Sequence, residues 1–329
     1  MEILKFLADE IIRFLGINSA LKILKAGDFS VFLTLDGIIS TITPLIPLLL
    51  ILELIMGLIH KNPHAKVYKI SFLIYVLNRF IGRFISIGMT AFIIAKLQKY
   101  AFFQANFTWY WLIYGYIVWE LSHFVYHFLG HKIRLFWCLH STHHAPENMN
   151  LSVTYAHFFL EAPYADTIRV SICILLGISP ELLFFIMFVD GTYGGFIHVG
   201  ENLMKNAKLG FLQHFILTPS HHRVHHARNP LYMDTNFCNL LNIWDRIFGT
   251  YQPEQEHTKV EYGITRTINS GNLIDVYFGE IVALVKDIAN APTLKDKLFY
   301  VFMPPGWSHT GNHKTATIVR NNFLTEVKK

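Results

Sequence analysis

The chain has 329 residues, 52% of them hydrophobic and only 16% charged, and its mean hydropathy is +0.34. Soluble domains carry about 25% charged residues, so this composition excludes a disordered chain and favours a membrane protein. The net charge of +5 comes without a basic run interleaved with aromatic residues, which argues against a nucleic-acid partner and suits a surface that meets anionic lipid.

The first 27 residues are predicted to form an amphipathic helix, because apolar residues recur at helical spacing between Ile3 and Leu15. Such a helix can lie on a membrane surface, or it can pack as an ordinary helix against the rest of the protein. The acidic residues Glu2, Asp9 and Glu10 argue against a cleavable signal peptide.

Four apolar segments follow, and each is long enough to supply the roughly 20 residues that a membrane-spanning helix needs. They cover residues 30–59, 70–97, 108–128 and 163–198. Pro44 and Pro47 predict that the first segment is either kinked or folded as a hairpin.

The second and fourth segments contain residues that an uninterrupted membrane-spanning helix usually lacks. Asn78, Arg79 and Arg83 lie near the middle of the second, so they face the bundle or water unless that helix runs along the interface. Gly177 and Pro180 are predicted to break the fourth segment into two halves, at about 163–178 and 181–198.

From about residue 199 the chain turns polar, with alternating helix and turn signals and no further span. Strand signals are weak throughout, so we expect an all-α protein. The division we expect is an N-terminal helix, a membrane-embedded domain and a polar helical extension, at 1–27, 28–250 and 251–329.

Histidine is the anomaly of the sequence, because 12 of the 18 histidines lie in the windows 123–144 and 198–226. Eight of them form an HxxxH box and two HxxHH boxes: His127 and His131; His140, His143 and His144; His222, His225 and His226. Positions i, i+3 and i+4 share one face of a helix, so we expect each box to aim its imidazoles at one point. Neutral imidazole suits zinc, iron, copper and nickel. Eight ligand nitrogens exceed what one ion takes, so the boxes predict two metal ions.

Convergence of these ligands constrains the topology. His144 and His198 must lie on the same side of the membrane, so the chain between them crosses it an even number of times. Basic residues flank the boxes and predict that this side is cytoplasmic: Lys132, Arg134, Lys205, Lys208, Arg223 and Arg228. The expected fold is therefore a multi-pass transmembrane helical domain with a cytoplasmic helical cap that carries a histidine-rich dimetal site.

Three strings support a family resemblance: FWCLHSTHH at 136–144, TPSHHRVHH at 218–226 and IWDRIFGT at 243–250. From about Glu120 to Tyr251 the sequence resembles the fatty acid hydroxylase/sterol desaturase superfamily of membrane di-iron enzymes. Within it, the chain is most similar to the alkylglycerol monooxygenase branch. The resemblance implies a catalytic domain over 28–250, in the bacterial inner membrane or the endoplasmic reticulum.

The resemblance also implies a set of metal-binding, catalytic residues. His198 fits the lone histidine that the family places between its second and third boxes. The implied ligands are thus His127, His131, His140, His143, His144, His198, His222, His225 and His226. His123 and His221 lie outside the family's boxes, and we expect them not to bind metal. His157 has no counterpart in the family pattern.

Four other residues are implied to support the ligands. Asn202 stands where some members carry a further histidine, so it is a weak ligand, a partner of a ligand, or a vacant position. Glu120 either orients an imidazole or pairs with Arg134. Asp234 and Asn236 either hydrogen-bond box histidines or cap the next helix.

The implied activity is that of an oxidoreductase: a lipid monooxygenase that hydroxylates an unactivated C–H bond with O₂. Ether-lipid cleavage of the alkylglycerol monooxygenase type is one form. A lipid or sterol desaturase on the same scaffold is an alternative, as is a non-enzymatic metal transporter or sensor. The implied cofactors are two iron ions, which zinc can replace on purification, and an external reductant. Tetrahydrobiopterin and a b5- or ferredoxin-type donor are the candidate reductants. The implied partners are a lipid substrate, the bilayer and this electron donor.

Overall fold

The computed structural model describes residues 9, 12, 15, 17–27, 30, 34–62 and 64–327. Most of the amphipathic helix expected over 1–27 lies outside these residues, and α2 (Asn18–Ala26) is its one described helix. Within the described ranges the chain is helical, and its β-structure is limited to three isolated bridges. The all-α prediction is therefore confirmed for this part of the chain.

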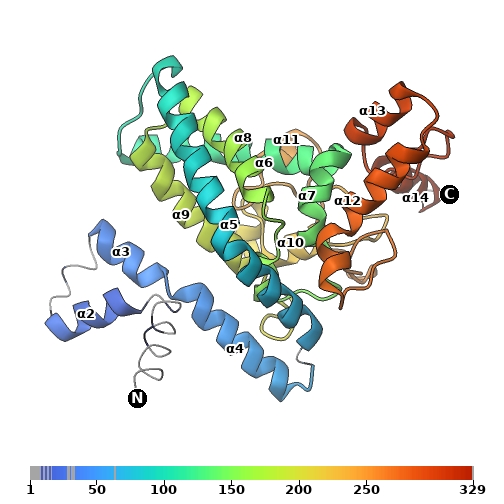
Figure 1. Cartoon of the computed structure of the whole chain (residues 1–329). Coiled ribbons are helices and arrows are strands. Elements are labelled where there is room, and N and C mark those ends of the chain that lie inside the picture. The colour runs from blue at the N-terminus through green and yellow to red at the C-terminus, as the bar shows by residue number, and fades with distance from the viewer. Residues whose placement is uncertain are drawn as a thin grey trace.

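The first apolar segment forms two helices, α3 (Leu35–Ile42) and α4 (Leu45–Ile59), which separate at Pro44. The break is a kink and not a hairpin, since the two helices run on in one direction (Figure 1). Among the described helices, Gly37–Ile59 is the one that is long and apolar enough to cross a membrane. Much of α4 is unpartnered, and Leu58 is 62% exposed.

The centre of the molecule is a bundle of the long helices α5 (Ala65–Leu97), α6 (Trp109–Lys132), α8 (Glu161–Leu175) and α9 (Pro180–Phe196). Helix α8 packs against α5 and α6, and α6 also packs against α9 (Figure 1). Apolar side chains fill the space between these helices, among them Trp119, Val170, Cys173, Leu182 and Ile186. The outer face of α5 is apolar too, with Phe72 64% and Phe84 73% exposed.

The fourth apolar segment breaks where its sequence predicts. Gly177 adopts a φ of 83°, and a Cβ at this position would lie 2.7 Å from Phe103 O. Ser179 then caps α9 by accepting a hydrogen bond from Leu182 N, and Pro180 occupies the first turn, where its missing N–H costs nothing. Helices α8 and α9 therefore form a hairpin.

The polar residue in the middle of α5 faces the protein interior. Asn78 donates to His157 O and accepts from the hydroxyl of Tyr277 in α12. These contacts satisfy one of the predictions for this segment, in which its polar groups face the bundle. The side chains of Arg79 and Arg83 lie outside the described residues.

Shorter helices and loops lie at one end of the bundle (Figure 1). They are α7 (Arg134–His144), α10 (Pro219–His225), α11 (Ile243–Ile247), α12 (Leu273–Asn290), α13 (Leu294–Phe302) and α14 (Ala316–Val327), with the 3₁₀ turns η3 (Leu151–Tyr155) and η4 (Gly210–His214). The 3₁₀ turn η2 (Gln98–Tyr100) instead follows the C-terminal end of α5, beside α8. Helix α12 packs against α7, α13 and α5, so the C-terminal residues cover the element that carries the second histidine box.

Two carboxylates on long helices hold the loops of this polar end. Glu53, only 1% exposed in α4, accepts hydrogen bonds from Leu151 N and Gly200 N, each at 2.6 Å. Glu120 in α6 accepts from three backbone N–H groups at 2.7–3.0 Å, those of Asn239, Leu240 and Leu241. Each acid replaces water as the partner of buried backbone groups.

Candidate metal centre

Three elements bring the histidine boxes together. Helix α6 ends at Lys132, and the extended residue Ile133 turns the chain directly into α7. The first and second boxes therefore face each other across a tight elbow. The third box lies on the short helix α10, and His198 follows the end of α9.

Five imidazoles form one buried group, which we call cluster A: His127, His131, His140, His144 and His225. One ring nitrogen from each lies within 4.8 Å of the others. His140 Nε2 is 3.0 Å from both His127 Nε2 and His144 Nε2.

Four further imidazoles form a second buried group, cluster B: His143, His198, His222 and His226. His198 Nε2 lies 3.1 Å from His143 Nε2 and 2.9 Å from His222 Nε2. The two clusters are neighbours, because the rings of His144 and His226 stack with centroids 4.3 Å apart.

The boxes do not each converge on one point, which corrects the sequence expectation. Positions i and i+4 of a box stay in one cluster, as His140 and His144 do, whereas position i+3 joins the other, as His143 and His225 do. Successive residues on an α-helix are about 100° apart, so positions i+3 and i+4 point to different sides of the box. Each of the two facing HxxHH boxes thus contributes its i+3 histidine to the cluster that contains the i and i+4 histidines of the other box.

The hydrogen bonds of the outer ring nitrogens fix where the lone pairs point. His127 Nδ1 donates to Phe237 O at 2.8 Å, and His140 Nδ1 donates to the Glu161 carboxylate at 2.6 Å. Since a carbonyl or carboxylate oxygen only accepts, both rings carry their proton on Nδ1. Their Nε2 lone pairs then face each other at 3.0 Å. His198 Nδ1 donates to Gly194 O in the same way.

Facing lone pairs need a cation between them, and the surroundings keep the rings from supplying a proton. Burial lowers the pKa of His198 to about 3. Burial, followed by the neighbouring imidazoles, also lowers the pKa of His222 and His226 well below the ordinary histidine value. In addition, the buried His131 Nε2 and His225 Nε2 have no hydrogen-bond partner among the described residues.

These features fit two metal ions. Neutral imidazoles with converging lone pairs and no carboxylate in either cluster suit zinc, iron, copper or nickel more than a hard cation. Outer nitrogens that donate to carbonyl and carboxylate oxygens are the usual support of metal-binding histidines. Cluster A would hold one ion through five imidazoles and cluster B the other through four.

The two histidines expected to lie outside the site have other roles. His221 is part of a capping box at the start of α10, where its Nδ1 accepts from Thr218 N, and its Nε2 is 2.8 Å from Tyr251 OH. His123 lies next to cluster A, with its ring centroid 5.6 Å from that of His127, but it belongs to neither cluster.

The four residues predicted to support the ligands differ in the contacts that they make. Asp234 Oδ1 is 3.4 Å from His131 Nδ1, which places it beside a box histidine, and its other carboxylate oxygen pairs with Lys132. Asn236 instead holds the loop by donating to His221 O and accepting from Gln252 N. Asn202 donates to Asn62 O.

Glu120 follows neither of its two predictions. It binds backbone N–H groups and not an imidazole. Arg134, its alternative partner, pairs with Asp287 at 2.7 Å.

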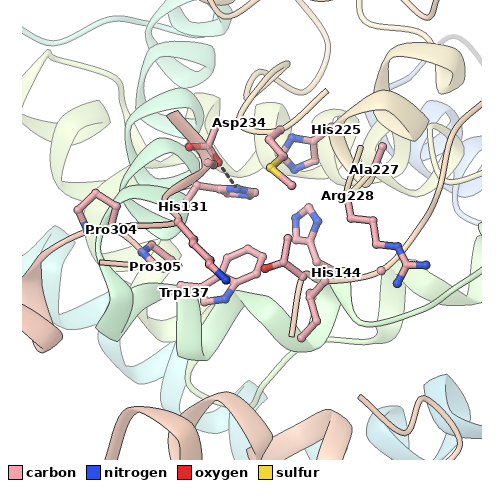
Figure 2. A pocket seen from close by; sticks show the side chains of 16 residues that line it. His131, Trp137, His144, His225, Ala227, Arg228, Asp234, Pro304 and Pro305 are labelled. Atoms are coloured by element: carbon pink, nitrogen blue, oxygen red, sulfur yellow. Dashed lines mark ion pairs between the residues drawn. The ribbon is translucent and has the colours of Figure 1, made fainter. Parts of the chain in front are cut away.

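Two cavities reach the histidines from different directions. One, of about 90 Å³, opens at the C-terminal side of cluster A and is lined by His131, His144 and His225 together with Trp137, Arg228 and Pro304–Gly306 (Figure 2). The other, of about 250 Å³, lies among α6, α8 and α9 and reaches both clusters. The centre is thus accessible from the polar end and from within the helical bundle.

Comparison with known proteins shows what this part of the chain resembles. Residues 112–250 match the fatty acid hydroxylase family model. The chain is 32% identical over 287 residues to alkylglycerol monooxygenase of Homo sapiens, a match that covers 84% of this chain and 62% of the relative. It is 33% identical over 190 residues to the Xenopus tropicalis enzyme of the same name, covering 57% of this chain and 40% of the relative.

Residues 112–250, which carry all nine cluster histidines, are therefore similar to the fatty acid hydroxylase family. A more distant relative is ornithine lipid hydroxylase OlsE of Rhizobium tropici, 24% identical over 162 residues, which are 49% of this chain and 48% of the relative. The chain spans less than two thirds of the length of the curated relatives it matches. No solved structure matches it.

Sequence reasoning missed one carboxylate of this site. Glu161, at the start of α8, is 2.6 Å from His140 Nδ1 and 2.8 Å from His157 Nδ1. His157 in turn stacks on His143, with ring centroids 4.2 Å apart. One acid therefore supports a ligand of cluster A directly and a ligand of cluster B through His157. The sequence feature that could have indicated this role is an acidic residue at the edge of an apolar segment.

Replacing Glu161 by glutamine is expected to weaken metal binding by about 10- to 100-fold, the usual cost of losing a group that orients a ligand. The amide offers one acceptor where two imidazole N–H groups need one each. Metal content after equilibration with a calibrated chelator measures the change. Glu147→Gln, an exposed acid whose carboxylate accepts from Ser270, serves as the control. Equal metal affinity in both variants would contradict the role given to Glu161.

Proposed function

We propose that this protein is a membrane di-iron monooxygenase that inserts one oxygen atom of O₂ into an unactivated C–H bond of a lipid. The observation that carries the proposal is the pair of buried imidazole clusters with facing lone pairs. In the net reaction, the second oxygen atom becomes water with two electrons and two protons from an external reductant. Oxidation at the carbon beside an ether oxygen gives a hemiacetal, which collapses to an aldehyde and an alcohol.

The residues of the chain hold and shield the centre. Bound iron would activate O₂, which is chemistry that no side chain here provides. Nine imidazoles fix the position of the two ions, and Glu161, Asp234 and backbone carbonyls set the orientation of the rings. All nine are buried, which keeps bulk water away from the reacting carbon.

The apolar surface supports a membrane setting for this reaction. The outward faces of α4 and α5 carry large exposed apolar side chains, and Gly37–Ile59 is long enough to span a bilayer. We propose that the cavity among α6, α8 and α9 receives the lipid from the bilayer. The opening beside Trp137 lies at the polar end, and we assign it to the reductant, on the cytoplasmic side.

Ether lipids are the substrate that the relatives suggest, because the relative from Homo sapiens, matched over 84% of this chain, is an alkylglycerol monooxygenase. The test is to supply iron-loaded protein with O₂, a reductant and a lipid extract, and to follow the lipids by mass spectrometry. Gain of one oxygen atom or release of a fatty aldehyde supports a monooxygenase. Loss of two hydrogen atoms identifies a desaturase, and no change in any lipid excludes both.

We expect two iron atoms per chain in protein prepared under reducing, iron-replete conditions, because each cluster has enough ligands for one ion. Elemental analysis and Mössbauer spectroscopy measure the number and the coupling of the ions. Zinc in a purified sample is compatible with the proposal, since zinc binds imidazole more tightly than Fe(II) does. A single ion per chain under these conditions would contradict the assignment of two sites.

A further inference from the structure

The cavity among α6, α8 and α9 has a polar end that the metal clusters do not use. Five of its lining residues are cluster histidines, and next to them lie His123, Asp190 and Asn239. His123 is 8% exposed and Asp190 is 3% exposed. These polar groups lie inside a bundle whose core is otherwise apolar, so they need a partner.

One atom in this group lacks a partner. His123 Nδ1 is buried and makes no hydrogen bond among the described residues, because the nearest acid oxygen, Asp190 Oδ2, is 3.8 Å away. That separation is too long for a hydrogen bond. It is the right spacing for a hydroxyl oxygen to contact both atoms at about 2.8 Å each.

We propose that His123 and Asp190 together bind a hydroxyl group of the lipid substrate. The inference rests on the proposed function, in that it takes a lipid to be the molecule that enters this cavity. Asn239 fixes the acid, since its Nδ2 donates to Asp190 Oδ1 at 2.7 Å and to Asp190 O at 2.9 Å. The Asp190 carboxylate can then accept a hydrogen bond from the hydroxyl, while the N–H of the His123 imidazole donates one to the hydroxyl oxygen.

The charges of the cavity indicate that the bound end of the lipid is uncharged. Arg169 is the one permanent cation among the lining residues, and its guanidinium pairs with Asp166 at 2.7 Å and lies over the Trp119 and Tyr126 rings. The acids Glu161 and Asp190 also line the cavity. A phosphate group would meet these acids with no unpaired cationic side chain to offset its charge, so a neutral hydroxylated end fits better.

The position of the pair also constrains the carbon that reacts. His123 is one helical turn before His127, and their ring centroids are 5.6 Å apart. A hydroxyl held by His123 and Asp190 therefore places the carbons next to it against the metal clusters. The alkyl chain must extend away from them, so oxidation should occur near the polar end of the lipid and not in mid-chain.

Binding of matched lipids tests the assignment. The probes are 1-O-hexadecylglycerol, its analogue without either hydroxyl group, and its phosphate monoester, each titrated into zinc-loaded protein, which binds lipid without oxidising it. Wild-type protein should bind the diol at least about tenfold more tightly than either of the other two, or about 1.4 kcal/mol. His123→Phe and Asp190→Leu should remove this preference while leaving affinity for the dideoxy analogue unchanged.

Controls separate binding from folding. Ser122→Ala alters a neighbouring residue whose hydroxyl donates to Trp119 O within α6, and it should keep the wild-type preference. Binding of two metal ions per chain shows that a variant is folded. If an apolar variant fails this test, His123→Gln or Asp190→Asn, which retain side-chain volume, replaces it. An equal loss of affinity for diol and analogue in these variants, or no loss for either, would overturn the assignment.

The outcome is distinguishable from failure of the proposed function. If iron-loaded wild-type protein oxidises lipids yet binds diol and dideoxy analogue equally, the monooxygenase stands and the hydroxyl site is wrong. Tighter binding of the phosphate monoester would also overturn the neutral-end assignment. If no lipid is bound or oxidised, both proposals fail.

Discussion

Changing His222 to alanine is expected to remove the metal of cluster B and to lower lipid oxidation more than about 100-fold, beyond the loss seen for groups that only orient ligands. His222 Nε2 lies 2.9 Å from His198 Nε2 and 3.1 Å from His226 Nε2, at the centre of that cluster. The lone pairs of the remaining three imidazoles still converge, but the ion of cluster B has lost its central ligand. Metal content should fall from two ions to about one per chain.

The neighbouring His221 provides the matched comparison. It is equally buried, yet its two nitrogens are occupied by Thr218 and Tyr251. His221→Ala should therefore keep both metal ions while reducing stability by about 1 kcal/mol, the typical cost of a lost helix cap. Loss of an ion in His221→Ala, or two retained ions in His222→Ala, would show that the third box is displaced by one residue.

The histidine boxes could be recognised from the sequence because their pattern is local. Spacings of three and four residues place imidazoles on one side of a helix, and the turn residues Gly177 and Pro180 marked the hairpin in the same local way. Which cluster each imidazole joins is a different matter. His143 and His144 are adjacent in the sequence but belong to different clusters. The cluster that each imidazole joins depends on how α7 and α10 approach each other.

The supporting acids were harder to predict for the same reason. Glu161 is 21 residues from His140, and Glu120 is about 120 residues from the backbone groups it binds. Their roles depend on contacts between distant segments, which one sequence does not reveal. Glu120 lies seven residues before the first box, a position that predicts a partner of an imidazole or of Arg134, whereas in the fold it accepts from the N–H groups of a buried loop.

Removing the Glu53 carboxylate is expected to release two loops of the metal centre at once. Its oxygens accept from Leu151 N, seven residues after His144, and from Gly200 N, two residues after His198. In Glu53→Leu both N–H groups would be buried without a partner, at a cost of about 1–3 kcal/mol each. The loop that positions His198 should then move, and cluster B should lose its ion before cluster A does.

A substitution at Gly200 tests the same contact from the other side. A Cβ at Gly200 would lie 2.2 Å from Met149 O and 3.1 Å from Glu53 Oε1, so Gly200→Ala must push these segments apart. Backbone atoms cannot turn aside as a flexible side chain can, and we expect a loss of thermal stability together with depletion of cluster B. Gly88→Ala in α5, where a Cβ meets nothing within 4 Å, should retain both ions.

Glu181→Gln is the matching control for Glu53, because Glu181 is an exposed acid at the start of another apolar helix, α9. Metal analysis of detergent-solubilised protein and its unfolding temperature give the two readouts. If Glu53→Leu and Gly200→Ala keep two ions and unfold at the temperature of the controls, the contact between α4 and the two loops does not hold cluster B together. If one ion is lost selectively, an acid in the most apolar helix is part of what positions His198, although it touches no ligand.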